Sequence, residues 1–177
     1  MTLKKDGKIN AAPRTSASFS AGDFVVYPTH GVGQVTAVET QTLGDQTVNL
    51  FVISFERERM TIRVPLAKAK SIGLRKLSTR AVMADVLTTL GGRPTAKRAM
   101  WNRRALEYVA KINSGNPVLI AEVVRDLHRN PTQTEQSYSE RQIYEQALDR
   151  LVHELAAVEK IGPEAAAMRF EKLLSAA

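Results

Sequence analysis

A short basic segment around the chain's only tryptophan, Trp101, concentrates residues that are suited to binding a partner. Its four cationic side chains are Lys97, Arg98, Arg103 and Arg104. Cations of this kind hold nucleic-acid phosphates, and a planar ring beside them can wedge between bases and unstack them. The same composition also fits a helix whose tryptophan faces the core while its charges face solvent. The residues of the segment leave both interpretations open.

The helix expected around Trp101 has a periodicity that slightly favours a buried ring. At about 3.6 residues per turn, one side of this helix carries the residues predicted to form its buried stripe: Ala105, Tyr108, Val109 and Ile112. Trp101 falls at the edge of that side. If the helix begins close to Trp101 rather than at Thr95, the ring lies at a helix end and can protrude. Periodicity therefore does not decide whether the ring is free.

The net charge of +7 is unevenly distributed along the chain. Residues 76–112 carry eight basic and two acidic side chains, whereas residues 113–177 carry seven basic and ten acidic ones. A focused basic region indicates a polyanionic partner, most simply nucleic acid. A solvated helix face has the same composition, so charge alone does not choose between a binding site and an ordinary surface.

Residue patterns for catalysis or metal binding are poor in this sequence. The chain has no cysteine, and its three histidines are too far apart for a zinc-binding motif: His30, His128 and His153. The pair Gly31 and Gly33 lacks the third glycine and the following helix of a dinucleotide-binding loop. Four acidic residues are expected to lie on solvated helix faces: Glu122, Asp126, Glu145 and Asp149. We therefore expect a protein that is not an enzyme and that uses no cofactor or metal.

Composition divides the chain into three parts. Residues 1–18 are rich in small and basic side chains and are expected to form a disordered basic tail. Residues 19–76 hold short β-rich runs, with a hairpin turn at Gly44 and Asp45 and a short last strand near residues 72–74. This spacing predicts a small antiparallel β-barrel of the Tudor or SH3 kind, which is typically a binding module.

Residues 77–177 are predicted to form a compact all-α bundle of about five helices, which makes the fold class α+β. Capping signals give the expected helix starts: Ser78, Thr95, Asn116 with Pro117, Ser139 in a capping box with Gln142, and Gly162 with Pro163. The basic segment would then lie on the second helix of the bundle.

No segment of the sequence is expected to enter a membrane. The first residues lead into no apolar run of the secretory kind, and no run approaches the roughly 18 apolar residues that a spanning helix needs. The absence of cysteine also fits a reducing compartment. We therefore expect a soluble cytoplasmic protein.

Four blocks of the sequence together resemble the CarD family of bacterial transcription regulators. They are residues 22–31 (GDFVVYPTHG), 60–65 (MTIRVP), 101–104 (WNRR) and 121–127 (AEVVRDL). Each block is short, but the four follow one another in the order and with the separation seen in the family. The resemblance runs from Phe19 to the C-terminus.

The resemblance implies a fold and a function for both halves of the chain. In CarD-like proteins the N-terminal Tudor-like domain binds the β subunit of RNA polymerase, and the helical domain meets promoter DNA at the upstream edge of the transcription bubble. A tryptophan equivalent to Trp101 wedges into the minor groove there, while basic neighbours hold the backbone. The implied result is a longer-lived open promoter complex, produced by a monomeric, nucleoid-associated protein.

The resemblance also assigns residues to the two interfaces. Arg63 and Thr61 belong to the strand that faces polymerase in the family. Gln41 stands where relatives often carry a basic residue on polymerase, so that contact is expected to be weakened or moved. The implied DNA contacts are Trp101, Arg103, Arg104, Lys97 and Arg98. Leu106 replaces another commonly basic residue, which makes the DNA patch depend more on the two cations before the tryptophan.

Two other functions remain open. One is a generic nucleic-acid-binding protein that never contacts polymerase, and the other is a protein-interaction adaptor whose basic region meets an acidic partner. A gel shift with and without polymerase separates these functions from a polymerase-tethered regulator.

Overall fold

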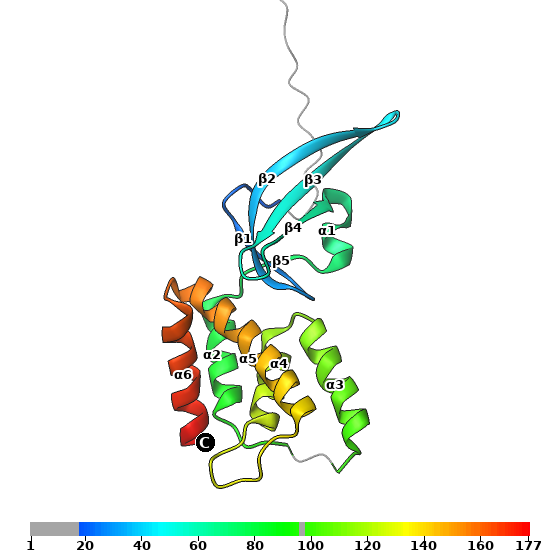
Figure 1. Cartoon of the computed structure of the whole chain (residues 1–177). Coiled ribbons are helices and arrows are strands. Elements are labelled where there is room, and N and C mark those ends of the chain that lie inside the picture. Colours follow the sequence, from blue (N-terminus) through cyan, green and yellow to red (C-terminus); the bar gives the residue numbers. More distant parts are fainter. Residues whose placement is uncertain (1–17, 96–97) are drawn as a thin grey trace, which may run out of the picture.

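Within the residues that the structure describes, 18–95 and 98–177, this computed structural model contains a five-stranded antiparallel sheet of order β4-β3-β2-β1-β5 (Figure 1). The strands are β1 (Phe24–Tyr27), β2 (Gly31–Leu43), β3 (Gln46–Phe55), β4 (Met60–Pro65) and β5 (Arg75–Lys76). Together with helix α1 (Leu66–Ile72) they form what we call the sheet unit, residues 18–76. The predicted basic tail lies, but for its last residue, outside the described residues.

Strands β2 and β3 form a long hairpin whose tip projects beyond the rest of the sheet unit (Figure 1). The predicted turn is confirmed, because Leu43 pairs with Gln46 across it. Gly44 has a φ of 63°, in the left-handed region that glycine tolerates best. We call residues 36–50, which lie on both sides of this turn, the hairpin arm.

A β-bulge at the base of the arm changes which side chains share a face. Ile53 and Val52 are neighbours on β3. Their partners on β2, Val35 and Ala37, are separated by Thr36, which is the extra residue. Side chains beyond Thr36 on β2 therefore point to the face opposite to the one that unbroken alternation would give them.

The fold class is α+β as predicted, but the sheet is open rather than closed into a barrel. Strands β4 and β5 form its two edges. The short last strand predicted near residues 72–74 lies instead at Arg75–Lys76, because Ile72 ends helix α1 and Gly73 follows with a left-handed φ of 86°. Residues 66–71 are rich in Ala, Leu and Lys, which favour a helix, and Gly73 is a common helix terminator. Helix α1 buries Ala69 against the sheet.

Five helices in the described residues after Lys76 agree with the predicted bundle (Figure 1). They are α2 (Arg80–Leu90), α3 (Trp101–Asn113), α4 (Pro117–Leu127), α5 (Tyr138–Glu159) and α6 (Pro163–Ala176). We call residues 77–95 and 98–177 the helical unit. None of the described helices is long and apolar enough to cross a membrane.

Two of the predicted helix caps are wrong by one or two residues. Thr79 rather than Ser78 caps α2, because the Ser78 hydroxyl bonds to a buried carboxylate described below. The capping box of α5 uses Ser137 and Glu140 instead of a box beginning at Ser139. The starts of α4 and α6 are as predicted.

Among the described residues, the two units have separate hydrophobic cores. Phe51, Ile53 and Phe55 fill the core of the sheet unit. In α3 the predicted stripe is largely confirmed, since Tyr108 and Ile112 are each 1% exposed. Val109 was expected to be buried but is 40% exposed, because it lies at the edge of the helix face that Tyr108 and Ile112 turn to the core.

Candidate nucleic-acid and protein interfaces

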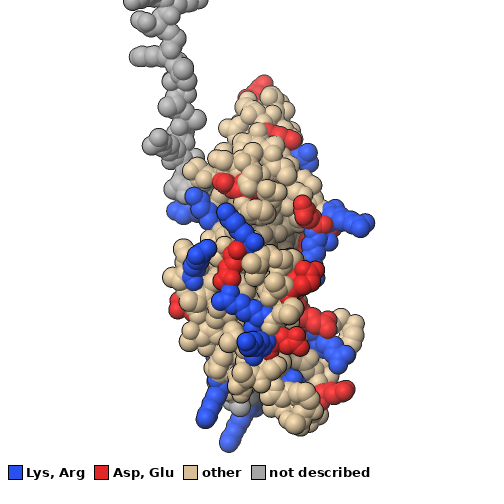
Figure 2. All heavy atoms as spheres, turned by 90° about the vertical axis from the view of Figure 1, so that its left-hand side faces the viewer, with Lys and Arg blue, Asp and Glu red and all other residues tan. Residues whose placement is uncertain are grey.

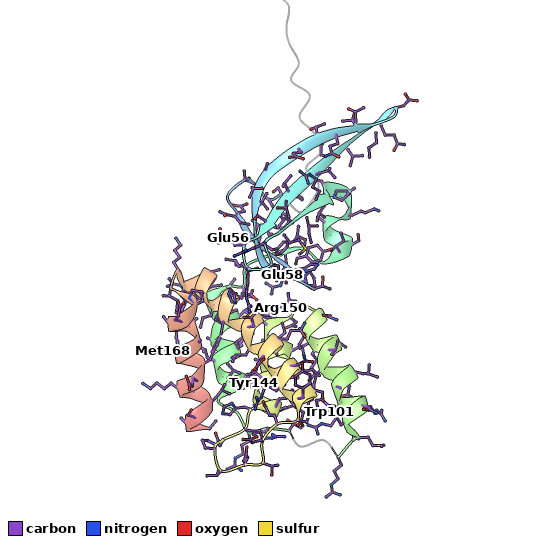
Figure 3. All side chains as sticks on the ribbon, in the orientation of Figure 1. Glu56, Glu58, Trp101, Tyr144, Arg150 and Met168 are labelled. Atoms are coloured by element: carbon purple, nitrogen blue, oxygen red, sulfur yellow. The ribbon has the colours of Figure 1, made fainter. Side chains whose placement is uncertain are left out.

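Trp101 is the first residue of α3, at the end of the helical unit that lies farthest from the sheet unit (Figure 3). The preceding residue, Met100, is 81% exposed, and the predicted cap at Thr95 lies in the loop before the helix. The indole ring is half-buried, because it packs against the edge of the helical core while part of it stays open to solvent. The ring is therefore neither sealed inside the bundle nor fully free.

A guanidinium group packs against both aromatic rings of α3. Trp101, Arg104 and Tyr108 are spaced by three and four residues, which places them on one helix face. The Cζ atom of Arg104 lies 5.7 Å from the ring centroid of Trp101 and 5.7 Å from that of Tyr108. The two centroids are 6.4 Å apart. The three groups lie at the corners of a triangle, which we call the stack, and because the Tyr108 ring is buried this cluster reaches from the core to the surface.

Two arginines beside this stack project into solvent. Arg98 and Arg103 are exposed, and neither side chain has an ion pair or hydrogen bond within the described ranges. The first turn of α3 has no acidic residue, and its unpaired N–H groups add positive potential. Figure 2 shows Lys and Arg side chains projecting at this lower end of the molecule. Lys97, the fourth predicted cation, lies outside the described residues.

Asp126 was expected on a solvated face but is only 6% exposed. It accepts the backbone N–H of Thr95 at 3.1 Å and pairs with Arg125 at 2.9 Å. Arg125 also donates to the Thr95 hydroxyl at 3.2 Å, so both residues tie the loop before α3 to α4. Sequence reasoning missed this anchor. The available signal was that α4 is apolar on nearly all sides, which buries the polar residue within it.

The residues predicted to bind polymerase lie on the sheet face opposite to its core. Arg63 and Thr61 are two residues apart on β4 and share this face. The partner of Thr61 on β3 is Ser54, whereas the partner of Gln41 is Val48. Because these partners are six residues apart on β3, about 20 Å separates Thr61 from Gln41. The structure therefore brings Arg63 and Thr61 together but leaves Gln41 out on the hairpin arm.

Arg63 already has a partner within the sheet unit. Its Nε donates to Glu39 Oε2 at 3.2 Å, and its side chain is 51% exposed. The bulge at Thr36 is what turns Glu39 to this face. An exposed ion pair of this kind adds little to stability, so Arg63 can exchange Glu39 for another carboxylate at small cost.

A buried carboxylate fastens the helical unit to the end of the sheet unit. Glu154 of α5 is 3% exposed and accepts from Arg75 Nη1 at 2.7 Å and Nη2 at 3.0 Å. It also accepts from the Ser78 backbone N–H at 3.0 Å and hydroxyl at 2.6 Å. Arg75 Nη2 donates as well to the Gly115 carbonyl at 2.7 Å. These four residues, which we call the joint, connect β5, the start of α2, the turn before α4, and α5.

Further contacts between the units surround the middle of α5. Arg57 pairs with Asp149, which is therefore a partner of the sheet unit and not a solvated residue as predicted. Arg150 donates to the carbonyl of Thr29 and lies between the two units (Figure 3). Gly31 has a φ of 83°, and a Cβ there would lie 3.0 Å from Arg150 Nη1. The units meet closely at this place because the glycine has no side chain.

The two remaining carboxylates that were expected on solvated helix faces differ in exposure. Glu145 is exposed, as expected. Glu122 is only partly exposed and accepts from Lys111 Nζ at 2.5 Å, which ties α4 to α3.

Burial shifts the pKa values of two groups where α5 meets the sheet unit. Burial lowers the pKa of Arg150; the charge of Glu58 raises that pKa and the charge of Arg57 lowers it. Burial, and then the charge of Arg57, lower the pKa of His153 below the ordinary value of 6.5. His153 Nδ1 lies 2.8 Å from the backbone carbonyl of Asp149, so this nitrogen carries a proton and donates to that oxygen.

Comparisons with known proteins cover both units. The family model described as CarD-like/TRCF RID domain matches residues 19–78, and the model described as CarD, C-terminal domain, matches residues 85–171. The "Putative transcription factor YdeB" of Bacillus subtilis (strain 168) is 27% identical over 143 residues, which cover 81% of this chain and 94% of that protein. The solution NMR structure of the 72-residue N-terminal domain of Myxococcus xanthus CarD is 34% identical, covers 37% of this chain and 91% of that one, and has a TM-score of 0.29.

The two family models match in the order of the two units and contain every block on which the resemblance depended. Residues 22–31 and 60–65 fall within the first model, and residues 101–104 and 121–127 fall within the second. The chain belongs to the CarD family.

Proposed function

We propose that this protein binds the β subunit of RNA polymerase through its sheet unit, contacts promoter DNA with the N-terminal end of α3, and prolongs the life of the open complex as a monomer. The observation that carries the proposal is that two different surfaces lie on one braced molecule. One is the outward sheet face around Arg63 and Thr61, and the other is the cationic end around Trp101. Because the joint connects the units, a molecule held by the first surface presents the second at a defined place.

The charge of the hairpin arm suits a protein partner better than DNA. The hairpin arm, residues 36–50, has two acidic residues, Glu39 and Asp45, and no Lys or Arg. Figure 2 shows the upper end of the molecule almost without basic side chains. The arm therefore has no cation to hold phosphates. We propose that Arg63 exchanges Glu39 for a carboxylate of the β subunit, with Thr61 beside it and Gln41 making a separate contact.

The end of α3 suits DNA that is partly melted. Arg98 and Arg103 would hold phosphates without reading sequence, with Lys97 as a further contact. The open part of the Trp101 ring would enter the minor groove at the upstream edge of the bubble and oppose restacking, which is worth about a few kcal/mol per base step. To oppose restacking of the bases, the ring must be held in place by the protein. Its inner part packs on the helical core, which provides this support.

The direct test is Trp101→Ala in an assay of open-complex lifetime. We expect the half-life to fall about tenfold toward its value without the protein, because the wedge is lost. The ring is half-buried, so unfolding is measured in parallel, and Trp101→Phe keeps an aromatic ring at the core edge with a smaller wedge. An unchanged half-life in the folded Trp101→Ala variant contradicts the wedge. If the helical unit fails to fold in both variants, Trp101 is a core residue and not a wedge.

Polymerase binding is tested by Arg63→Glu against an isolated β-subunit fragment. Reversal of the charge should raise the Kd about tenfold or more, because the proposed carboxylate partner is then repelled. Lys68→Glu makes the same charge change on exposed α1 and should leave the Kd unchanged. Equal Kd values for Arg63→Glu and the native protein remove Arg63 from the interface.

Free duplex DNA separates this function from its alternatives. We expect weak binding to duplex alone and strong binding only when polymerase is present. Tight binding without polymerase, with a log–log salt slope of about −0.9 per phosphate contact, indicates a generic nucleic-acid-binding protein. Promoter crosslinking that survives charge reversal at Arg103 and Arg104 indicates a protein adaptor instead.

A further inference from the structure

We propose that Arg104 is a positioning residue, which holds the Trp101 ring and acts on DNA through that ring rather than through a phosphate. The inference depends on the proposed function, because the ring that Arg104 holds is the proposed wedge. It gives Arg104 a different role from the phosphate contact that the family resemblance implied.

The guanidinium of Arg104 is occupied on the side that a phosphate would use. A side-on contact to phosphate takes two parallel N–H groups, Nε–H and one from Nη2. In Arg104, Nη2 donates to the Tyr108 hydroxyl at 3.3 Å. Its Nε is buried and has no hydrogen-bond acceptor among the described residues. Both groups of the side-on fork are therefore turned toward the protein.

The two rings take the place of that missing acceptor. At 5.7 Å from both centroids, the guanidinium lies within the range of a cation–π contact with Trp101 and with Tyr108. Desolvation strengthens such contacts, and the buried Nε shows that this side of the group is dry. Arg103, the next residue along the chain, is exposed and has no such contact in the described structure.

The stack transfers the rigidity of the core to the helix end. Tyr108 is 1% exposed and belongs to the helical core, so its ring is held on all sides. Arg104 packs against both Tyr108 and Trp101, and the two rings also contact each other, with their centroids 6.4 Å apart. Trp101 itself is the first residue of α3, where a helix otherwise frays. Without Arg104 the ring keeps its contacts with Tyr108 and the core edge but loses the group that packs against both rings, and a looser wedge loses preorganisation.

The free protein tests the support directly, because Trp101 is the only tryptophan of the chain. Acrylamide is a neutral quencher, so removing a charge does not change its local concentration. Arg104→Met should raise the acrylamide quenching constant about twofold and lower the fluorescence anisotropy, because the ring gains mobility. Arg104→Lys keeps the charge, so its quenching constant and anisotropy should lie between those of Arg104→Met and those of the native protein. Arg103→Met is the matched control and should change neither quantity.

The promoter complex distinguishes positioning from phosphate contact. Arg104→Met should shorten the open-complex half-life about threefold in the native background, the size of one cation–π contact. The same change should have no further effect in the Trp101→Ala background, because the ring that it positions is absent. The salt slope of DNA binding should stay unchanged. Arg103→Met, in contrast, should lower the slope by about 0.9 and act independently of Trp101→Ala.

Each result decides one question. An additive effect of Arg104→Met together with a lower salt slope makes Arg104 a phosphate contact and overturns the inference. Unchanged quenching and anisotropy in Arg104→Met also overturn it. If Trp101→Ala leaves the half-life unchanged, the proposed function fails, while the fluorescence of the free protein still decides whether Arg104 holds the ring.

Discussion

The joint and the α3 end use the same type of side chain for opposite purposes. In the joint, Arg75 donates to both oxygens of Glu154 and to the Gly115 carbonyl. At the α3 end, the side chains of Arg98 and Arg103 have no partner among residues 18–95 and 98–177. An arginine with satisfied donors fixes a structure, whereas an arginine with free donors can bind an external anion.

The difference shows why net charge alone does not locate a binding surface. Charge counts treat Arg75 and Arg103 alike, although one connects two units and the other faces solvent. Arg104 stands between these cases, because its donors face two rings and a hydroxyl rather than a carboxylate or water. The partners of an arginine, and not its charge, indicate which role it has.

Glu154→Ala should have the largest effect, because it breaks the joint. The change leaves Arg75 and the Ser78 N–H without their buried acceptor and should lower the free energy of unfolding by about 3 kcal/mol. Urea denaturation measures the loss. Glu145→Ala, on the exposed side of the same helix, should have almost no effect. A loss as small as that of Glu145→Ala would mean that the joint does not hold the units together.

Gly115→Ala should have the next largest effect, because Gly115 lies where the units meet. Its φ is 70°, and a Cβ would lie 3.1 Å from Pro28 Cα. Backbone strain and crowding together should lower the free energy of unfolding by about 2 kcal/mol, measured by thermal or urea denaturation. Gly44→Ala is the matched control, since Gly44 has a φ of 63° but open space around it, and should cost about 1 kcal/mol. Equal losses of stability in the two variants would show that the structure around Gly115 and Pro28 adjusts to an added Cβ without cost.

Arg103→Ala should separate binding from stability at the α3 end. The side chain has no partner within the described residues, so the free energy of unfolding should change by less than about 0.5 kcal/mol. The log–log salt slope of promoter binding should fall by about 0.9, because one phosphate contact is removed. A destabilised variant with an unchanged slope would place Arg103 with the structural arginines.

Acidification should produce the smallest effect, and it concerns the contact between the units. The pKa of His153 is lowered in the folded protein, so the unfolded chain binds more protons as the pH falls through 6.5. The contribution of His153 to stability is therefore fully present well above pH 6.5 and is lost below it. His153→Gln should flatten this part of the stability profile. A profile with the same slope in the variant would assign the pH dependence to another group.

Local signals predicted much of this structure from the sequence. The hairpin turn at Gly44, the Asn116 cap and the division into strands and helices all follow from residues close together in the chain. Helix α1 was missed because its seven residues are too few for a periodic pattern. The open sheet follows in part from this helix, since α1 occupies the chain between β4 and the last strand.

The site was harder to predict because its geometry depends on distant residues. Arg75 and Glu154 are 79 residues apart, and nothing in either neighbourhood marks them as a pair. The exposure of Trp101 depends on where α3 begins, which capping signals placed at Thr95. The stack around Arg104 was visible only as spacing, since three and four residues separate it from the two rings. Spacing gives the shared helix face, but burial of Nε requires the packed structure.

The bulge at Thr36 has a consequence for how the hairpin arm can change in length. It sets the side chains of Glu39 and Gln41 on the same face as Arg63. Deleting Thr36 alone would remove the bulge but keep Val35 opposite Ile53 and Ala37 opposite Val52, so Glu39 and Gln41 would stay on this face. The arm should therefore tolerate the loss of this one residue, whereas a single residue added elsewhere on one strand should survive only if a new bulge absorbs it.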